Sequence, residues 1–322
     1  MKYKNLDGIK NPLSALVYGT PGPAFAGNCE VAFKSYDYAW EAGFRIFDTA
    51  HLYREGERVL GEWIESRGHR SEIVILDKGC NPCAKGSEDV FSASTIREQI
   101  ELSLKRLKTD CVELYILHRD DDDLPVDPIM EELNKLKQEG KVIRLGASNW
   151  TFKRIMEANR FAKENGMEGF TVVSPQYSLV DYNNDIWGHS ISLSGEAQKA
   201  YRDWLTETQT PTFCYSSLAR GYLSGKFKPS SSKPIEECIA DWPIQEYDCP
   251  KNRKRLAKAE KLANERGLTI PQVALAWMLK QPMNLFPIVV PSSQEHINEI
   301  ARSVDVELSD EECVWLTADD VD

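Results

Sequence analysis

Four residues whose side chains do acid–base chemistry occupy similar places in the sequence. Asp48, Lys78 and His118 each end a short apolar run, and Tyr53 follows Asp48 by five residues. In parallel barrels and open α/β sheets, reactive groups gather where the strands end, so we expect these four side chains to share one cleft. A carboxylate would hold the lysine ammonium, and the ammonium would draw the pKa of the phenol down from its ordinary value of about 10. The set predicts a tunable proton donor.

The strands that would carry these residues alternate with helical patterns along the chain. The runs that predict strands are residues 14–18, 45–48, 73–78, 112–118, 142–148, 171–174, 212–215 and 287–290. Such alternation is typical of a parallel sheet wrapped by helices. Eight units predict a closed (β/α)8 barrel, the TIM barrel of the α/β class.

Apolar residues at helical spacing predict the helices between these strands. They cover residues 56–66, 94–107, 127–139, 151–165 and 254–266, and another helix opens at Thr269. The stretches 177–194 and 226–250 lie outside the alternation and are long and irregular. Loops of this length in a compact domain are usually functional, so we expect them to cover the mouth of the cleft and a cofactor.

The composition fits one globular domain over residues 1–322. Hydrophobic residues make up 42% of the chain and charged residues 28%, which is near the globular average and leaves enough apolar side chains for a large core. The length would allow two average domains, but α/β barrels of this size form one domain and no linker interrupts the pattern. A single domain is therefore expected.

Charge and hydropathy exclude several classes of partner. The formal net charge of -11, without clustered Lys and Arg, argues against nucleic acid. The first residues lack an apolar signal core, and no run approaches the roughly 18 apolar residues that a membrane span requires. A cytoplasmic location, with no membrane partner, is the expectation.

The cysteines do not predict a disulfide framework or a metal site. Eight cysteines are too few for a disulfide scaffold in a chain of 322 residues. Cys80 and Cys83 have the C-x-x-C spacing of a redox pair or half a zinc site, but no second pair or histidine cluster supplies the remaining ligands. No metal is expected, and the pair is interpreted as part of a loop that lines the cleft.

Motifs spread over nearly the whole chain resemble those of the aldo-keto reductases. They are Phe47-Asp48-Thr49-Ala50 with Tyr53, Gly56-Glu57, Lys78-Gly79, Ser103 to Asp110, His118-Arg119, Gly146-Ala147-Ser148-Asn149 and Tyr215 to Lys226. The resemblance implies a barrel enzyme that interconverts an aldehyde or ketone and its alcohol by hydride transfer from NAD(P)H. It also implies that Tyr53 is the general acid, that Asp48 and Lys78 lower its pKa, and that His118 orients the carbonyl.

The cofactor must be held without a Rossmann motif, since no strand is followed by G-x-G-x-x-G. By resemblance, Ser148, Asn149 and Gln176 would bind the nicotinamide amide and Tyr215 would stack on the ring. Leu218, Arg220 and Lys226 match the stretch that clamps the diphosphate. The remaining residues that the resemblance assigns to this cofactor site are Gly19, Thr20, Asp48, Ser216 and Gly221.

The adenosine-binding segment matches less well. It would use Ser292, Ser293, His296 and Glu299, but it lacks the Lys or Arg that pairs with the 2′-phosphate in many members, and Ile300 replaces the usual Asn. Hydroxyls and the N–H groups at the start of a helix still hold phosphate, and Lys226 would help. NADP(H) is favoured on family grounds, with NAD(H) as the competitor.

Each of these residues also has a purely structural interpretation. Alone, Asp48 would be a strand-end carboxylate, Lys78 a side chain that reaches solvent, and His118 a structural histidine. The acidic run at residues 119–123 is either a solvated loop or a polar rim that favours hydroxylated or cationic substrates. With Trp187 and His189 as lid residues, such a rim would suit a sugar-like carbonyl compound.

Two rival functions remain. A barrel of this kind could be a cofactor-binding sensor or regulatory subunit with little turnover, as the β subunits of potassium channels are. An unrelated barrel enzyme such as a glycosidase would need a second carboxyl facing Asp48, and none ends the other three runs. The natural substrate, the direction of reaction and the oligomeric state are not fixed by the sequence.

Overall fold

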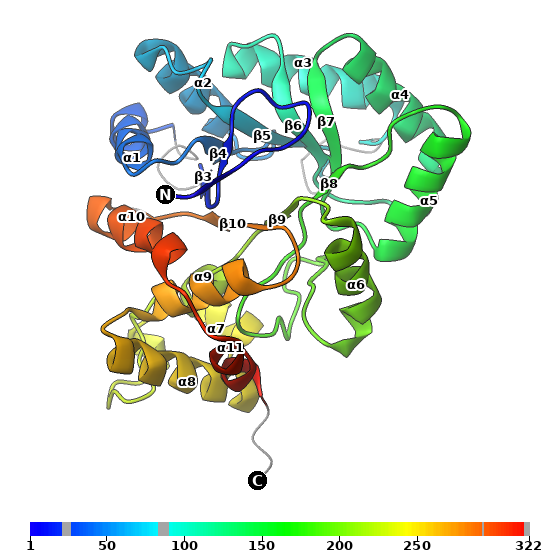
Figure 1. Ribbon diagram of the computed structural model, residues 1–322. Coiled ribbons are helices and arrows are strands. Elements are labelled where there is room, and N and C mark those ends of the chain that lie inside the picture. The colour runs from blue at the N-terminus through cyan, green and yellow to red at the C-terminus, as the bar shows by residue number, and fades with distance from the viewer. Residues whose placement is uncertain (21–26, 83–89, 292, 319–322) are drawn as a thin grey trace.

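The structure, a computed structural model, describes residues 1–20, 27–82, 90–291 and 293–318. Within these ranges, eight parallel strands close a barrel in the order β10-β3-β4-β5-β6-β7-β8-β9, and helices surround it (Figure 1). The predicted (β/α)8 barrel is confirmed. The strands are β3 Val17–Gly19, β4 Ile46–Asp48, β5 Val74–Gly79, β6 Val112–Leu117, β7 Val142–Ala147, β8 Val172–Val173, β9 Thr212–Cys214 and β10 Leu285–Val289.

Helices fill the connections between strands and continue after the last one. They are α1 Cys29–Glu41, α2 Gly56–Arg67, α3 Ala93–Leu107, α4 Val126–Gln138, α5 Phe152–Glu164, α6 Lys199–Thr208, α7 Asp241–Tyr247, α8 Pro250–Arg266, α9 Ile270–Lys280, α10 Gln294–Ala301 and α11 Asp310–Thr317. Short 3-10 helices are η2 Glu196–Gln198, η3 Ala219–Gly221, η4 Ile235–Glu237 and η5 Arg302–Asp305. No helix of the described ranges is both long and apolar enough to cross a membrane.

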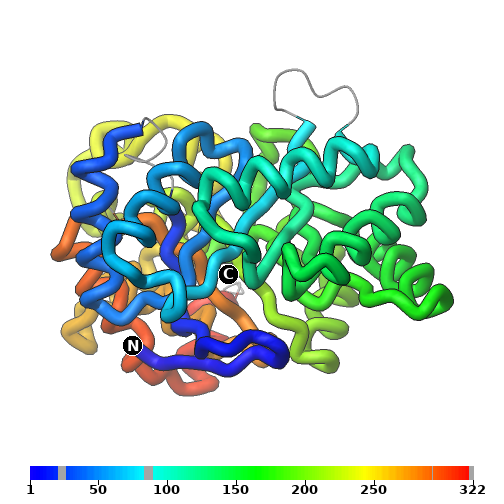
Figure 2. The backbone as a smooth tube through the Cα atoms, turned by 90° about the horizontal axis from the view of Figure 1, so that it is seen from above, coloured from blue at the N-terminus to red at the C-terminus, as the bar shows by residue number. Residues whose placement is uncertain are grey.

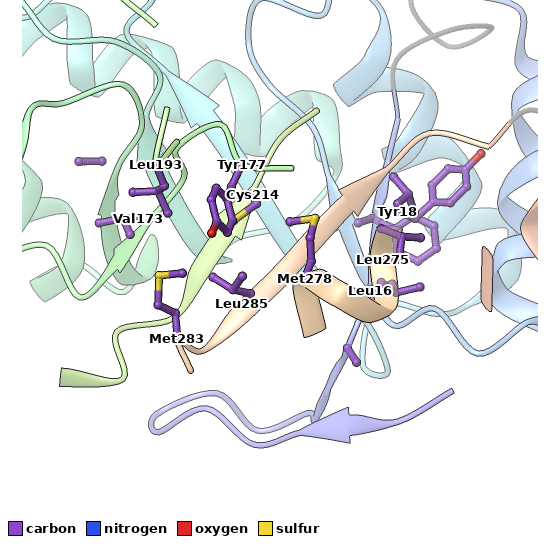
Figure 3. Packing of buried hydrophobic residues seen from close by; sticks show 14 of the residues in the cluster. Leu16, Tyr18, Val173, Tyr177, Leu193, Cys214, Leu275, Met278, Met283 and Leu285 are labelled. Atoms are coloured by element: carbon purple, nitrogen blue, oxygen red, sulfur yellow. The ribbon is translucent and has the colours of Figure 1, made fainter. Parts of the chain in front are cut away.

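Alternation along the strands sorts their side chains into two buried layers. Because successive residues of a strand point to opposite faces, one set fills the barrel and the other meets the helices. The inner set includes Val17, Ile46, Val74, Leu76, Leu114, Ile116, Val172, Phe213, Phe286 and Ile288. The outer set packs under the helices, and Figure 3 shows Leu275 and Met278 of α9 among outer-layer side chains such as Cys214 and Leu285.

A hairpin closes the amino-terminal end of the barrel. Strands β1 Tyr3–Lys4 and β2 Leu13–Ser14 pair antiparallel, and Ile9 and Leu13 pack into the inner apolar cluster. Figure 2 shows this dark-blue hairpin along one side of the molecule, and the yellow segment that contains α7 on the opposite side. The carboxyl ends of the strands are therefore left for the site.

Some predicted boundaries were wrong. The first predicted strand, residues 14–18, is split, because Ser14 belongs to the hairpin and the barrel strand begins at Val17. The last barrel strand begins two residues before Pro287, and α8 begins at Pro250, four residues before its predicted start. Pro250 fits there because the first turn of a helix needs no N–H from it.

The stretch 226–250 is less irregular than predicted. It contains η4 and the seven-residue helix α7, whose sequence Asp241-Trp-Pro-Ile-Gln-Glu-Tyr247 has too few turns to display a helical period. The stretch 177–194 holds no helix and is a long loop, as predicted. Helices α1, α6, α10 and α11 were not predicted.

Candidate active site

The three strand-end residues Asp48, Lys78 and His118 are in phase with the inner layer of the barrel. Ile46 precedes Asp48 by two positions, and Leu76 and Ile116 stand in the same relation to the other two; all three of these apolar residues belong to the inner cluster. Side chains two apart on a strand share a face. The three ionisable side chains therefore lie at the end of the apolar barrel interior that is opposite the hairpin.

Asp48 and Lys78 form a buried ion pair. The Lys78 ammonium donates to Asp48 Oδ1 and, at 3.2 Å, to the backbone carbonyl of Thr49, while both residues are only 3% exposed. Burial lowers the pKa of Lys78, but the carboxylate of Asp48 and the phenol of Tyr53 outweigh it, and the net shift of its pKa is upward. Burial raises the pKa of Asp48, and Lys78 opposes that rise. The ammonium is thus held charged beside its carboxylate.

Tyr53 lies in the turn that leads into α2, and its ring lies near Lys78 and His118. Its N–H donates to Ala50 and its carbonyl accepts from Gly56, which fixes the turn. The ring centroid is 5.4 Å from Lys78 Nζ and 6.0 Å from the imidazole centroid of His118, with the two rings at 83°. All four predicted catalytic side chains therefore converge.

The direction of the Tyr53 pKa shift differs from the sequence-based expectation. Burial raises the pKa of this phenol, Lys78 lowers it, Asp48 raises it and the guanidinium of Arg220 lowers it, and the net shift is upward. Desolvation penalises the phenolate more than Lys78 and Arg220 compensate, because Lys78 already shares its field with Asp48. In the protein without ligands, Tyr53 is a firmly protonated donor.

His118 is neutral and has a free ring nitrogen. Burial, together with the charges of Lys78 and Arg119, holds the pKa of His118 well below its ordinary value. Its Nδ1 is buried without a hydrogen-bond partner in the described part of the chain, and its backbone N–H donates to Gly79 at 2.7 Å. A neutral imidazole can donate one hydrogen bond to a carbonyl oxygen without adding charge.

The predicted nicotinamide residues form one connected wall. Asn149 Oδ1 accepts from the hydroxyl of Tyr215 at 2.7 Å, and Asn149 Nδ2 donates to Ser148 Oγ and to the carbonyl of His118, each at 3.1 Å. Asn149 adopts a left-handed conformation with φ of 61°, which asparagine tolerates better than most residues. The ring of Tyr215 packs against the inner cluster. Gln176 receives a hydrogen bond from Ser192 at 2.6 Å.

The predicted diphosphate residues follow β9. The turn begins at Ser216, whose carbonyl accepts from Ala219 at 2.7 Å, and the carbonyl of Leu218 accepts from Gly221 at 3.0 Å. Lys226 is exposed at the end of this stretch. Arg220 is committed elsewhere, since its Nε pairs with Glu246 Oε2 at 3.0 Å.

Gly19 ends the first barrel strand, β3, beside Asp48, and Thr20 follows it. The Thr20 N–H donates to the Asp48 carbonyl at 2.9 Å, and its buried hydroxyl has no well-formed hydrogen bond within the described residues. A Cβ on Gly19 would come within 2.9 Å of Val290 Cγ2, so a side chain here would require Val290 to shift. A bound molecule could therefore approach the backbone of Gly19 and the hydroxyl of Thr20 closely.

The adenosine segment is only partly described. Ser293 caps α10 by accepting from the N–H of His296 at 3.3 Å, and the Glu299 carbonyl accepts from Gln272 at 3.1 Å. His296 is exposed on the first turn of α10. Ser292 lies outside the described residues.

Cys80 is buried beside Lys78 and His118, and Asp120 forms an ion pair with a residue of α5. Cys80 is fully buried, lines a small cavity with Lys78 and His118, and burial raises the pKa of its thiol to about 12. Cys83 lies outside the described residues. Asp120 pairs with Arg154 of α5 at 3.2 Å, which favours the interpretation of the acidic run as an ordinary surface loop over that of a substrate-binding rim.

Several residues near the site were missed by the sequence analysis. Glu246 and Trp242 lie on α7, a helix too short to be recognised, and no signal in the sequence indicated either. Arg119 donates to the carbonyls of Gly188 and His189 and so fastens the 177–194 loop beside His118. The Thr49 carbonyl that accepts from Lys78 belongs to the Asp48 motif and could have been inferred from it.

Outer-layer acids lie behind Lys78. Asp77 is fully buried, and neither of its oxygens has a well-formed hydrogen bond in the ranges that the structure covers. Glu57, also fully buried, accepts from Ser103 and from Arg106 at 2.8 Å. Burial and the charge of Glu57 hold the pKa of Asp77 well above its ordinary value, although the backbone and the charge of Lys78 and the hydroxyl of Ser103 oppose the rise.

These side chains fit a nicotinamide cofactor better than a metal. Gln176 Nε2 has only long contacts of 3.4 Å, to Ser178 and Tyr247, and the Thr20 hydroxyl lacks a well-formed bond, so polar groups at the wall have unused capacity. Among the described residues, no cluster of three or more His, Cys, Asp or Glu could hold a metal ion.

Fold and site together define the class: a barrel oxidoreductase that reduces carbonyl groups with a nicotinamide cofactor. The profile of the Aldo/keto reductase family matches residues 16–318, and the chain belongs to that family. A Bacillus subtilis protein named uncharacterized oxidoreductase YrpG is 30% identical and covers 97% of this chain and 93% of its own.

Two fungal relatives carry more specific names. Norsolorinic acid reductase B of Dothistroma septosporum is 28% identical over 95% of this chain and 76% of its own length. A Schizosaccharomyces pombe aldo-keto reductase whose name includes NADP(+) is 28% identical over 85% of this chain and 77% of its own. The chain is therefore an NAD(P)-dependent oxidoreductase of this family.

Proposed function

We propose that this protein reduces an aldehyde or ketone with NADPH and that Tyr53 supplies the proton. The observation that carries the proposal is the convergence of Tyr53 and His118 on the buried ion pair of Lys78 and Asp48. Each arises from a different strand end or turn, and a purely structural ion pair would not need a phenol and a neutral imidazole beside it.

Each side chain has one task in this proposal. The imidazole of His118 donates a hydrogen bond to the substrate oxygen and so orients the carbonyl. The nicotinamide, when bound, supplies a hydride to the carbonyl carbon. As the oxygen becomes alkoxide-like, Tyr53 Oη gives it a proton, and the Lys78 ammonium stabilises the phenolate that remains. Asp48 keeps Lys78 in place and charged, and oxidation of the alcohol reverses these steps.

The raised pKa of Tyr53 is compatible with this role. An acid must be protonated before it donates, and burial ensures that state in the protein without ligands. Lys78 already favours the phenolate, so the charge that forms after proton transfer is not left unpaired. The ammonium therefore acts at the moment of transfer.

NADPH is preferred over NADH in this proposal. One relative's name includes NADP(+), and the exposed Lys226 provides a cation near the predicted diphosphate stretch. The segment at residues 293–299 offers hydroxyl, imidazole and backbone N–H groups in place of a fixed cation. NADH is the rival that initial rates with both cofactors decide.

Tyr53→Phe tests the assignment. We expect kcat to fall by about 10²–10⁴-fold, the usual contribution of a positioned acid, while the Kd for NADPH from fluorescence titration changes little. Tyr201→Phe is the matched control, because Tyr201 is a buried phenol that stacks on Phe152 of the helical layer. Unchanged turnover in Tyr53→Phe would remove the phenol from its role. Tight NADPH binding without turnover by the unaltered protein, over a broad carbonyl panel, would favour the sensor.

A further inference from the structure

Two histidines hold the end of β5 from opposite sides. The backbone N–H of His51 donates to the carbonyl of Lys78, and that of His118 donates to the carbonyl of Gly79, each at 2.7 Å. Strand β5 pairs with β4 on one side and with β6 on the other, so the two imidazoles follow neighbouring strand ends. His51 is thus a neighbour of the reacting centre, yet the reaction proposed above gives it no task.

Both imidazoles line one small cavity. Its volume is about 10 Å³, and Lys78, Gly79, Cys80 and Gln99 also line it. A polar cavity of roughly 10–15 Å³ holds one water molecule when two to four polar groups face it. The space therefore suits a single water and no larger ligand.

Two ring nitrogens at this place have no hydrogen bond to any residue that the structure describes. They are Nδ1 of His51 and Nδ1 of His118, and both atoms are buried. A buried polar atom left without a partner is costly, and in folded proteins nearly all such atoms are bonded to protein or to ordered water. Two imidazoles at one cavity with the same unmet requirement point to a shared partner.

Gln99 of α3 supplies a third polar group. Its Oε1 accepts from the N–H of Cys80 at 2.8 Å, which orients the amide at the cavity and leaves the N–H groups of the amide as donors. A water molecule has two O–H donors and accepts hydrogen bonds at its oxygen. Two imidazole nitrogens and one amide N–H therefore match it, and three hydrogen bonds are the usual number for a buried water.

The surroundings favour the neutral form of both rings. Burial lowers the pKa of His51 and of His118, and the charges of Lys78 and Arg119 lower that of His118 further. A neutral imidazole carries one N–H group and one bare nitrogen that accepts. A donor at Nδ1 therefore leaves the ring proton on Nε2.

We propose that this cavity is the binding site of one water molecule, which donates to Nδ1 of His51 and to Nδ1 of His118 and accepts from Gln99. The water fixes the tautomer of His118 that carries its proton on Nε2, the nitrogen that then donates to the carbonyl oxygen of the substrate. His51 is a positioning residue, because it acts on the reaction through this water. The inference rests on the proposed function and adds a residue to it.

A crystal structure and NMR of the histidine ring nitrogens test the water without reference to turnover. We expect one density peak within about 3.2 Å of both Nδ1 atoms. The NMR spectrum should show His118 with its proton on Nε2, and the Nδ1 resonance of His118 should shift in His51→Phe. Absence of the peak, or a proton on Nδ1 of His118, overturns the site.

Kinetics test the positioning role. In His51→Phe, kcat/KM for butanal with NADPH should fall roughly tenfold, as it does when the partner that orients a functional histidine is removed. The loss should come through kcat more than KM, and the Kd for NADPH should change little. His51→Asn should recover most of the rate, because its Oδ1 takes the place of the imidazole Nδ1. Equal loss in both variants overturns the role of the nitrogen.

The pH profile separates positioning from a merely structural role. A hydrogen bond donated to the neutral imidazole disfavours its protonation, so loss of the water should raise the pKa of His118. The fall of kcat/KM on acidification should then begin at higher pH in His51→Phe than in the unaltered protein. The charged groups around the two rings are kept in this variant; they are Glu57, Arg106, Lys78 and Arg119. An unmoved profile overturns the positioning role.

His69→Phe is the matched control. His69 lies between α2 and β5 and stacks on Trp40 with ring centroids 3.7 Å apart, so phenylalanine keeps its packing. This variant should leave the His118 resonance, the rate and the pH profile unchanged. If His51→Phe does not fold, Gln99→Leu removes a different partner of the water and should shift the same resonance; an unshifted resonance overturns the site. Absence of turnover by the unaltered protein with every carbonyl tested fails the proposed function, whereas the density peak and the NMR spectrum judge the water alone.

Discussion

Two buried aspartates on neighbouring strands have opposite surroundings. Asp48, at the end of β4, faces the barrel interior and touches the ammonium of Lys78. Asp77, the residue before Lys78 on β5, faces the helices, where its charged neighbour is the second acid Glu57. Burial raises the pKa of both carboxyls, but only Asp48 has a cation in contact. The inner layer therefore holds a carboxyl in contact with a cation, whereas the outer layer holds one whose pKa is raised beside a second acid.

The difference teaches where this fold tolerates charge. Removing an isolated charge from water costs several kcal/mol, so a buried carboxyl stays ionised only beside a fixed cation. Alternation along β5 assigns the cation to the inner layer, since Lys78 and Asp77 point to opposite faces. One strand thus separates the ion pair of Asp48 and Lys78 from a buried carboxyl whose pKa is raised.

Removing the cation should have the largest effect. Lys78→Met leaves Asp48 buried without its partner, so we expect the free energy of unfolding to fall by about 3–5 kcal/mol and turnover to be lost. Urea unfolding at pH 7 and kcat with NADPH measure the two effects. The double variant Asp48→Asn with Lys78→Met should recover much of the stability and none of the activity. Lys78→Met with unaltered stability would contradict the ion pair.

Asp77→Asn should stabilise the protein by a smaller amount. The pKa of Asp77 is raised in the folded state, so the stability of the natural protein is full below the unfolded pKa of about 3.9 and is lost as pH rises above it. Asparagine does not titrate and has nearly the same shape. The variant should match the natural protein near pH 4 and exceed it by about 1–3 kcal/mol at pH 7.

Thermal unfolding across pH 4–8 checks this prediction. The groups that face Asp77 are Glu57, Ser103 and Lys78, and Glu57 is itself held by Arg106. Glu57→Gln is the control, since it weakens bonds to Ser103 and Arg106 and should destabilise at every pH in this range. A destabilised Asp77→Asn at pH 7 would mean that the native carboxyl is ionised.

The smallest effect is expected when the pH is lowered through the range in which a free histidine becomes protonated. Because burial and then the charge of Lys78 hold its pKa well below the ordinary value, the imidazole stays neutral from pH 8 down to pH 6. The profile of kcat/KM against pH should therefore show no loss from His118 protonation in that interval. A fall with an apparent pKa between 6 and 7 that disappears in His118→Ala would contradict it.

Strand-end chemistry could be predicted from the sequence because two local rules determine it. Apolar runs located the strands, and a period of two fixed which end residue faces inward. Asp48, Lys78 and His118 obey both rules, and the turn at Tyr53 is short enough to keep it near them. The site therefore required no long-range information beyond closure of the barrel.

The cover of the site could not be predicted in this way. Arg220, Glu246 and Trp242 come together through loops and a seven-residue helix, and no periodic pattern records such contacts. The direction of the Tyr53 pKa shift was also missed, because it depends on how completely the surrounding chain removes water from the phenol. Both failures concern tertiary packing.

The apolar hairpin at the far end of the barrel has a consequence for solvent. Ile9 and Leu13 are buried in the inner apolar cluster at that end, so the hairpin shields the barrel interior from water there. In the proposed reaction, the proton that Tyr53 donates would therefore be replaced from the carboxyl ends of the strands, the end at which the substrate binds.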